Sequence, residues 1–259
     1  MRIKQSVCYP ILRPEGMTLD ELFKVSADIG YAAVEMWGRG DDFKDVCALA
    51  KKHKLVMASM VGHSSLPDGL NKRSNHERIA AELTESIDLA AKHGIPGVIC
   101  FSGNRQPHMS EMEAIEATAD GLRRIAPYAE RKGVNLNLEL LNSKRDHAGY
   151  QCDHTEWGVA VVQRVGSPRV KLLYDIYHMA IMEGDLIATI REHIQWIGHF
   201  HTAGNPGRND MDDTQELNYA GICKAIAGTD YDLYVGHEFK PKGDVIDALR
   251  QTFELCDQG

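Results

Sequence analysis

Short apolar runs alternate with longer amphipathic stretches along most of this 259-residue chain. Eight apolar runs have the length and composition of strands: 3–8, 32–37, 55–61, 96–101, 134–140, 170–175, 195–201 and 231–238. Each run is followed by a segment with helical periodicity, so one unit takes about 32 residues. This alternation predicts repeated βα units on a parallel sheet.

The starts of three helices are marked by a Ser/Thr-x-x-Glu pattern, at Thr18–Glu21, Ser74–Glu77 and Ser110–Glu113. In such a capping box the hydroxyl accepts a hydrogen bond from an amide of the first turn, and the glutamate reaches back to the cap. After Ser110, apolar residues recur at three- and four-residue steps and predict one buried helix face: Ile115, Ala119, Leu122, Ile125 and Ala129. We expect Glu216 to cap the seventh helix, because a carboxylate favours the positive end of the helix dipole.

No Pro-, Gly- or Ser-rich linker or change of composition divides the chain. Eight βα units of this size fit a single (β/α)8 TIM barrel, in which right-handed crossovers close the sheet. We therefore expect one α/β domain over residues 1–259. A doubly wound open sheet is the alternative, but it usually carries a glycine-rich turn after its first strand. This chain has Cys8-Tyr9-Pro10 at that point.

The composition is that of an ordinary folded protein, with 43% hydrophobic and 25% charged residues. A net charge of −8 without a basic tract disfavours non-specific binding to nucleic acid. No apolar run reaches the roughly 18 residues of a membrane span, and the first residues do not resemble a secretory signal. The six cysteines are scattered without a CxxC pair, which favours reduced thiols and a cytoplasmic location.

Potential metal ligands end each of the last four predicted strands: Glu139, Asp175, His201 and Glu238. The chemistry of a (β/α)8 barrel lies at the C-terminal ends of its strands, so these side chains are expected to converge at the barrel mouth. Three carboxylates and one imidazole suit Mn²⁺ or Mg²⁺, with Co²⁺ or Zn²⁺ as alternatives. Without a cation, three converging carboxylates would repel one another. The other interpretation, ordinary surface charges, is weaker for four successive strand ends than for any one of them.

Three further residues are candidates for binding a substrate. His178 follows Asp175 by three residues, so the turn would bring it over the same site. Arg208 lies in a polar loop and could hold a carboxylate with its fork of donors. His63 follows the third predicted strand and could face the barrel mouth, where Trp37 could add an apolar wall. A solvated arginine and histidines bonded to backbone are the ordinary alternatives.

Five segments resemble the hydroxypyruvate isomerase family: LELLN at 138–142, YDIYHM at 174–179, HTAGNPGR at 201–208, QELNY at 215–219 and GHEFKP at 236–241. The resemblance runs over most of the chain and is densest from 134 to 241. That family belongs to the xylose isomerase-like superfamily, which also contains ketose 3-epimerases and endonuclease IV. The signatures of serine hydrolases, P-loop enzymes and zincins (GxSxG, the Walker loop and HExxH) are missing.

The resemblance implies a divalent metal held by Glu139, Asp175, His201 and Glu238, and substrate contacts from His178 and Arg208. It also implies that Glu139 and Glu238 are catalytic and move the proton. The expected reaction takes a proton from the carbon beside a carbonyl and returns it to the neighbouring carbon, while the metal stabilises the enediolate. For hydroxypyruvate the product is tartronate semialdehyde, and Arg208 would hold the substrate carboxylate.

Three alternatives stay open. A ketose 3-epimerase, or another 2-oxo-acid or sugar isomerase, could use the same residues. An endonuclease IV-like enzyme would need a trinuclear zinc site and a basic face, and both the charge and the Phe101-Ser102-Gly103 end of the fourth strand argue against it. The third alternative is a non-catalytic sugar-binding barrel. The expected partner is thus a small hydroxy-carbonyl compound rather than nucleic acid or a membrane, and a homo-oligomer is compatible with the sequence.

Overall fold

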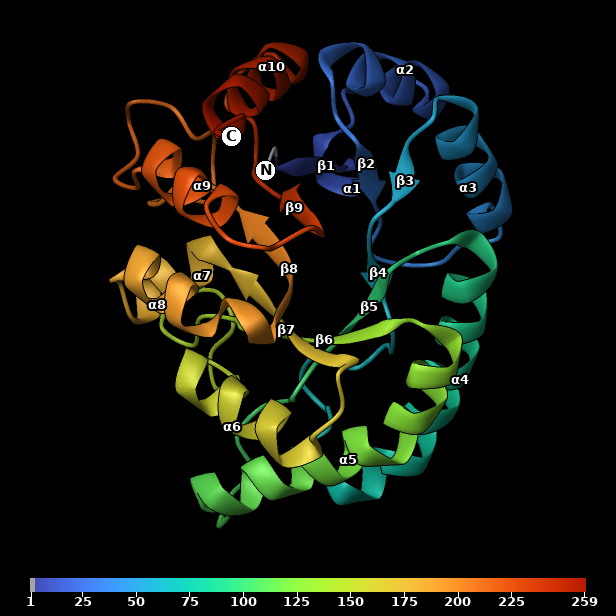
Figure 1. Cartoon of the computed structure of the whole chain (residues 1–259), viewed down its shortest axis with the longest axis vertical. Helices are drawn as coiled ribbons and strands as arrows, with labels where there is room; N and C mark the ends of the chain where they lie inside the picture. Colours follow the sequence, from blue (N-terminus) through green and yellow to red (C-terminus); the bar gives the residue numbers. More distant parts are fainter. Residues whose placement is uncertain (1–2) are drawn as a thin grey trace. The chain divides into compact units, whose positions relative to one another are not determined.

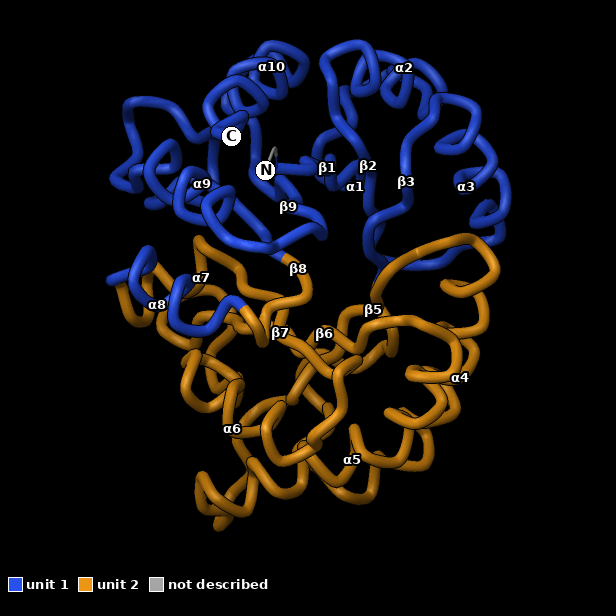
Figure 2. The backbone as a smooth tube through the Cα atoms, in the orientation of Figure 1, with its two compact units in different colours: residues 1–60, 185–194, 200–259 blue, residues 61–184, 195–199 orange. Residues whose placement is uncertain are grey.

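The computed structural model describes residues 3–259, and the chain forms two compact units (Figure 2). Unit 1 takes the chain up to residue 60 together with 185–194 and 200–259, and unit 2 takes 61–184 and 195–199. The single domain expected over residues 1–259 stays a prediction. The two units are described separately below.

Unit 1 is built on parallel strands in the order β3-β2-β1-β9-β8. Their bounds are Lys4–Cys8 for β1, Ala33–Glu35 for β2, Val56–Met57 for β3, Ile197–Thr202 for β8 and Tyr234–His237 for β9, with residues 197–199 of β8 assigned to unit 2. The register sets Cys8 of β1 opposite Glu35 of β2, and His201 of β8 opposite Gly236 of β9. Glu35 and His201 therefore lie toward the carboxyl ends of their strands.

The helices of unit 1 are α1 (Tyr9–Leu12), α2 (Leu19–Ile29), α3 (Phe43–Lys52), α8 (Leu186–His193), α9 (Tyr219–Ala227) and α10 (Val245–Cys256). Helix α2 packs against α3 and α10, and α9 packs against α8 and α10. This row of helices follows the outside of the strands (Figure 1). Their buried apolar faces, for example Leu22 and Phe23 of α2, fill the space between helix and sheet.

Unit 2 repeats the same construction with parallel strands β5 (Gly97–Cys100), β6 (Asn135–Glu139) and β7 (Val170–Asp175). Its helices are α4 (His76–His93), α5 (Glu111–Lys132), α6 (Thr155–Val165) and α7 (Ile176–Met182). Helices α4, α5 and α6 each pack on the strand that follows them, and α5 also packs against both α4 and α6 (Figure 1). The apolar stripe predicted for α5 is confirmed, since all five of its residues are buried.

The third predicted strand, 55–61, is two short strands, β3 and β4 (Met60–Val61). Up to residue 59 the backbone bonds to β2: the Ala58 N–H donates to the Val34 carbonyl, and the Met36 N–H donates to the Ser59 carbonyl. From there the chain turns to a different neighbour, and the Gly62 N–H donates to the Ile99 carbonyl of β5. One apolar run thus forms backbone hydrogen bonds first with the β2 region and then with β5.

Two of the three predicted capping boxes are confirmed, at Thr18–Glu21 and Ser110–Glu113. The third was wrong. Ser74 lies inside a 3₁₀ turn, η1 (Arg73–Asn75), and α4 begins after Asn75, whose side chain makes no cap hydrogen bond. Because Ser74 is already within a helical turn, it is not the residue that flanks α4.

All six cysteines are buried, and none of them forms a disulfide within residues 3–259. A second short 3₁₀ turn, η2 (Ile194–Trp196), leads into β8. Over residues 3–259 the structure has no helix that is both long enough and apolar enough to cross a lipid bilayer.

Candidate functional site

In unit 1 the structure brings together two of the predicted metal ligands, His201 and Glu238. His201 lies on β8, and Glu238 directly follows β9, its hydrogen-bonded neighbour. Both side chains are buried, and Nδ1 of His201 is 3.4 Å from Oε2 of Glu238. The strand pairing therefore delivers an imidazole nitrogen and a carboxylate to one point.

The Glu238 carboxylate is held ionised by its neighbours. Burial opposes ionisation, but the adjacent His201 and the Arg208 guanidinium, with a hydrogen bond from Trp37, lower the pKa of Glu238 to about 2. The indole Nε1–H donates to Oε1 at 2.5 Å, and Arg208 forms an ion pair with Oε2. The Cys8 thiol lies 3.9 Å from Oε1. At neutral pH this side chain is therefore a carboxylate, the form that binds a cation.

Arg208 is carried by a loop that is tied to the strand region. Its carbonyl accepts from the Lys240 N–H at 2.7 Å, and its backbone adopts a left-handed conformation with φ of 57°. The same loop corrects the expected role of Glu216. Glu216 accepts from the Asn205 amide at 2.6 Å, whereas Asn218 caps α9 by accepting from the Gly221 N–H. Helix α9 begins after Asn218, so Glu216 is too far upstream to cap it.

In unit 2 the other two predicted ligands end paired parallel strands. Glu139 is the last residue of β6 and Asp175 the last residue of β7, and both are buried. Asp175 also caps α7, because its Oδ1 accepts the His178 N–H at 3.0 Å. The second oxygen, Oδ2, lies 3.6 Å from Nε2 of His178. The cap therefore fixes the carboxylate while using only one of its oxygens.

The His178 ring is oriented by Asn142. Oδ1 of Asn142 accepts from the N–H groups of Arg145 and Asp146, so its amide nitrogen must face His178 Nδ1, which lies at 2.6 Å. Nδ1 then accepts this hydrogen bond, which leaves the ring proton on Nε2, on the side of Asp175. His178 is thus a fully buried donor beside a proposed metal ligand.

His63 has a different environment in unit 2. Its Nε2 accepts from the Phe101 N–H at 2.9 Å, and its ring packs edge-on against Phe101 at 5.6 Å between centroids. Burial lowers the pKa of His63 to about 4, so the ring is neutral and supports the end of β5. The expectation that His63 contacts substrate stays a prediction.

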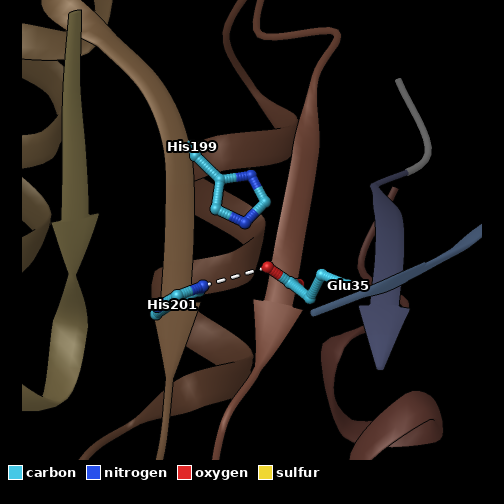
Figure 3. Close-up of side chains that lie close together, drawn as sticks. All are labelled: Glu35, His199 and His201. Atoms are coloured by element: carbon cyan, nitrogen blue, oxygen red, sulfur yellow. Dashed lines mark hydrogen bonds and ion pairs between the residues drawn. The ribbon is translucent and has the colours of Figure 1, made fainter. Parts of the chain in front are cut away.

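Glu35 was not singled out from the sequence. It ends β2, and its carboxylate accepts a hydrogen bond from Ser6 and lies 3.0 Å from Nε2 of His201 (Figure 3). The signal that could have found it is a lone charged residue in the apolar run 32–37, a position that is 2% exposed in the structure.

Two sets of buried side chains could hold a metal ion, and they share His201. One set is the predicted one: Glu139, Asp175, His201 and Glu238. The other is Glu35, His199 and His201, with the two histidines on one face of β8 (Figure 3). Carboxylate oxygens with one imidazole nitrogen are the donors that Mn²⁺ and Mg²⁺ accept, so the predicted set fits such an ion.

Comparison with known proteins agrees with this architecture. The xylose isomerase-like TIM barrel family matches residues 23–256. Hydroxypyruvate isomerase from Escherichia coli is 33% identical over 166 residues, which are 64% of this chain and 63% of that enzyme. A Drosophila melanogaster relative whose name also includes hydroxypyruvate isomerase is 32% identical over 258 residues. The match covers 92% of this chain and 92% of that protein.

A solved structure shows the same fold at lower identity. The crystal structure of an AP endonuclease, family 2, from Brucella melitensis has a TM-score of 0.83 at 23% identity, covering 96% of this chain and 97% of that one. With the family match over most of the chain, this confirms the predicted (β/α)8 TIM barrel class. The chain belongs to the xylose isomerase-like TIM barrel family and is an isomerase of its hydroxypyruvate isomerase branch.

Proposed function

We propose that this protein is a metal-dependent isomerase that interconverts hydroxypyruvate and tartronate semialdehyde. The observation that carries the proposal is the buried His201–Glu238 pair with Arg208 bound to the same carboxylate. A cation-binding carboxylate and a guanidinium side by side suit a small substrate that has both polarisable oxygens and a carboxylate of its own. The name of the E. coli relative supports the choice of hydroxypyruvate.

The proposed ligands of a single Mn²⁺ or Mg²⁺ ion are Glu139, Asp175, His201 and Glu238. Their donor chemistry fits: Glu238 is ionised, and Asp175 keeps one oxygen outside the α7 cap. When bound, the ion would supply Lewis acidity to the carbonyl and hydroxyl oxygens of the substrate.

The proton transfer is assigned to Glu139 and Glu238. One glutamate, as the carboxylate, takes a proton from C3 of hydroxypyruvate, and the C2 carbonyl oxygen becomes the enolate oxygen of a C2–C3 enediolate. The other glutamate, which starts as the neutral carboxylic acid, gives its proton to C2, while the proton of the C3 hydroxyl passes to the C2 oxygen and C3 becomes the aldehyde. The substrate gains and loses no proton overall, and the two glutamates end with their protonation states exchanged, so a proton returns between them through solvent before the next turnover.

Two residues are assigned to substrate recognition. His178 presents an Nε2–H donor to a substrate oxygen, because Asn142 occupies its Nδ1. Arg208 exchanges its ion pair with Glu238 for the substrate carboxylate and leaves Glu238 free to act on the carbon acid. Its planar fork matches a carboxylate better than the point charge of a lysine.

Glu139→Gln and Glu238→Gln test the proton transfer. Each keeps the size of the side chain but removes its basicity, so turnover of hydroxypyruvate with Mn²⁺ should fall about 10²-fold or more. Exchange of solvent deuterium into the substrate separates the two roles, since only loss of the first base abolishes exchange. A variant that keeps its metal by calorimetry and still turns over at the wild-type rate would overturn the assignment.

Arg208→Lys tests the choice of substrate. It should lower kcat/KM for hydroxypyruvate more than for a neutral ketose, because only the former has a carboxylate. Equal losses on both substrates would favour a ketose 3-epimerase instead. Incision of DNA at abasic sites by the wild-type protein would favour the endonuclease alternative.

A further inference from the structure

A buried hydrogen-bonded chain in unit 1 leads from Ser6 through Glu35 to His201. The Ser6 hydroxyl donates to Oε1 of Glu35, and Oε2 lies 3.0 Å from Nε2 of His201 (Figure 3). Ser6, Glu35 and His201 are each no more than 2% exposed. Glu35 therefore has both oxygens engaged inside the protein, one of them by a proposed metal ligand.

We propose that Glu35 is a positioning residue that keeps a proton on Nε2 of His201 and so leaves Nδ1 to bind the metal. This inference rests on the metal site of the proposed function. A neutral imidazole has one proton for two nitrogens, and only the nitrogen without a proton can donate electrons to a cation. Which nitrogen that is depends on the hydrogen bond that the other one makes.

The two nitrogens of His201 face competing carboxylates. Nε2 is 3.0 Å from Glu35, whereas Nδ1 is 3.4 Å from Glu238. The shorter contact is the stronger hydrogen bond, so the proton belongs on Nε2. With no carboxylate at position 35, Glu238 would be the better acceptor, and the proton would move to Nδ1. That proton would then have to be displaced before a metal could bind.

The strand opposite His201 leaves room for this arrangement. Gly236 pairs with His201 across β8 and β9, and a Cβ at position 236 would overlap the Glu35 carboxylate and come within 3.0 Å of the His201 ring. The backbone of Gly236 needs no unusual dihedral angle, since its φ is not in the positive region. The small residue therefore serves the close approach of Glu35 rather than the path of the strand.

Glu35→Gln tests the proposal, with Glu183→Gln as a matched control. Glu183 is an exposed residue outside the site, and like Glu35 its carboxylate accepts hydrogen bonds, from the backbone and hydroxyl of Thr155 at the start of α6. The Glu35→Gln variant should lose 10- to 100-fold in affinity for Mn²⁺ by calorimetry, the usual effect of removing such a partner. The control should bind Mn²⁺ as the wild type does, even if it is less stable.

Long-range ¹H–¹⁵N spectra of histidine-labelled protein give a second readout that needs no catalysis. In wild-type protein Nε2 of His201 should be protonated both without metal and with Mg²⁺. In metal-free Glu35→Gln the proton should appear on Nδ1, and it should stay on Nε2 in Glu183→Gln. The His201 signals are assigned by their loss in His201→Gln.

The outcomes separate the inference from the proposed function. Wild-type metal binding with an unchanged His201 proton in Glu35→Gln overturns the role of Glu35 and leaves the metal site standing. A proton shift in a protein that binds no ion overturns the metal site and leaves the Glu35–His201 relation standing. Two ions per wild-type chain, one of them lost in Glu35→Gln, would make Glu35 a ligand and overturn its positioning role.

Discussion

Buried histidines in this protein differ in function because their partners differ, although the residue type is the same. His63 accepts a backbone N–H, and His178 accepts an amide N–H from Asn142. His201 instead lies between two carboxylates, Glu35 and Glu238. An imidazole that accepts a hydrogen bond at one nitrogen is kept neutral. An imidazole between two carboxylates lies in a negatively charged environment, which favours a bound cation nearby.

The neutral state of His63 has a consequence for stability at acid pH. Its pKa is about 4 in the folded protein and near 6.5 when unfolded, so the unfolded chain binds the proton first as the pH falls. The free energy of unfolding should therefore drop between about pH 6.5 and about pH 4, by roughly 3 kcal/mol at most from this group.

His63→Gln should flatten that part of the profile, because glutamine can still accept from the Phe101 N–H and does not titrate. Urea denaturation of both proteins at pH 7, 6, 5 and 4 measures the difference. Parallel profiles would show that His63 does not remain neutral in the folded protein.

At the start of α7 one side chain, Asp175, both caps the helix and is a proposed metal ligand. Asp175 ends β7 and caps α7 with Oδ1. A residue at this junction satisfies the free N–H of the helix and presents its other oxygen at the end of the strand. The capping Asp175 and His178, whose backbone N–H it accepts, therefore belong to one helical turn.

Asp175→Asn and Asp175→Ala separate the two roles. Asparagine can still accept the His178 N–H, so in the presence of chelator the alanine variant should be less stable than the asparagine variant by about 1 kcal/mol. Both variants should bind Mn²⁺ much more weakly, because both lack the carboxylate. Strong Mn²⁺ binding by Asp175→Asn in a calorimeter would remove Asp175 from the ligand set.

Two of the three hydroxyl residues that the sequence presents as caps, Thr18 and Ser74, provide a matched pair. Thr18 forms both hydrogen bonds of its box, whereas Ser74 lies within η1. Thr18→Ala should lower the free energy of unfolding by about 1 kcal/mol, and Ser74→Ala should lower it by less than half of that. Urea denaturation measures the free energy of unfolding of both variants. An equal loss of this free energy in the two variants would mean that Ser74 does cap α4.

For the molecule as a whole, the proposed metal should act as a stabiliser. The proposed ligands lie between positions 139 and 238, so a bound ion would tie residues that are far apart in the sequence. A ligand that binds only the folded state adds free energy according to its concentration, about 2.7 kcal/mol at one hundred times Kd.

Mn²⁺ should therefore raise the melting temperature of the wild-type protein, and chelator should reverse the rise. His201→Ala should lose most of this response, whereas Thr18→Ala, which is outside the site, should keep it. Calorimetric melting with and without Mn²⁺ gives the comparison. An identical rise in the His201→Ala variant would place the ion elsewhere.

The sequence alone determined the βα order, the barrel class and the positions of the charged residues and histidine at the strand ends, because these depend on local periodicity and on motifs read along the chain. Hydrophobic spacing identifies the buried face of α5 without knowledge of its neighbours. The family segments around 139, 175, 201 and 238 then indicated the type of chemistry.

Only the tertiary structure decided which partners the polar groups take. In the structure the run 55–61 is divided into two short strands, and α4 begins after Ser74. Glu216 accepts a hydrogen bond from Asn205 and does not cap α9. The structure also pairs Glu35 with His201, 166 positions further along the chain. A hydrogen bond depends on ångström distances between side chains, and residue spacing along the sequence does not encode such distances across separate strands.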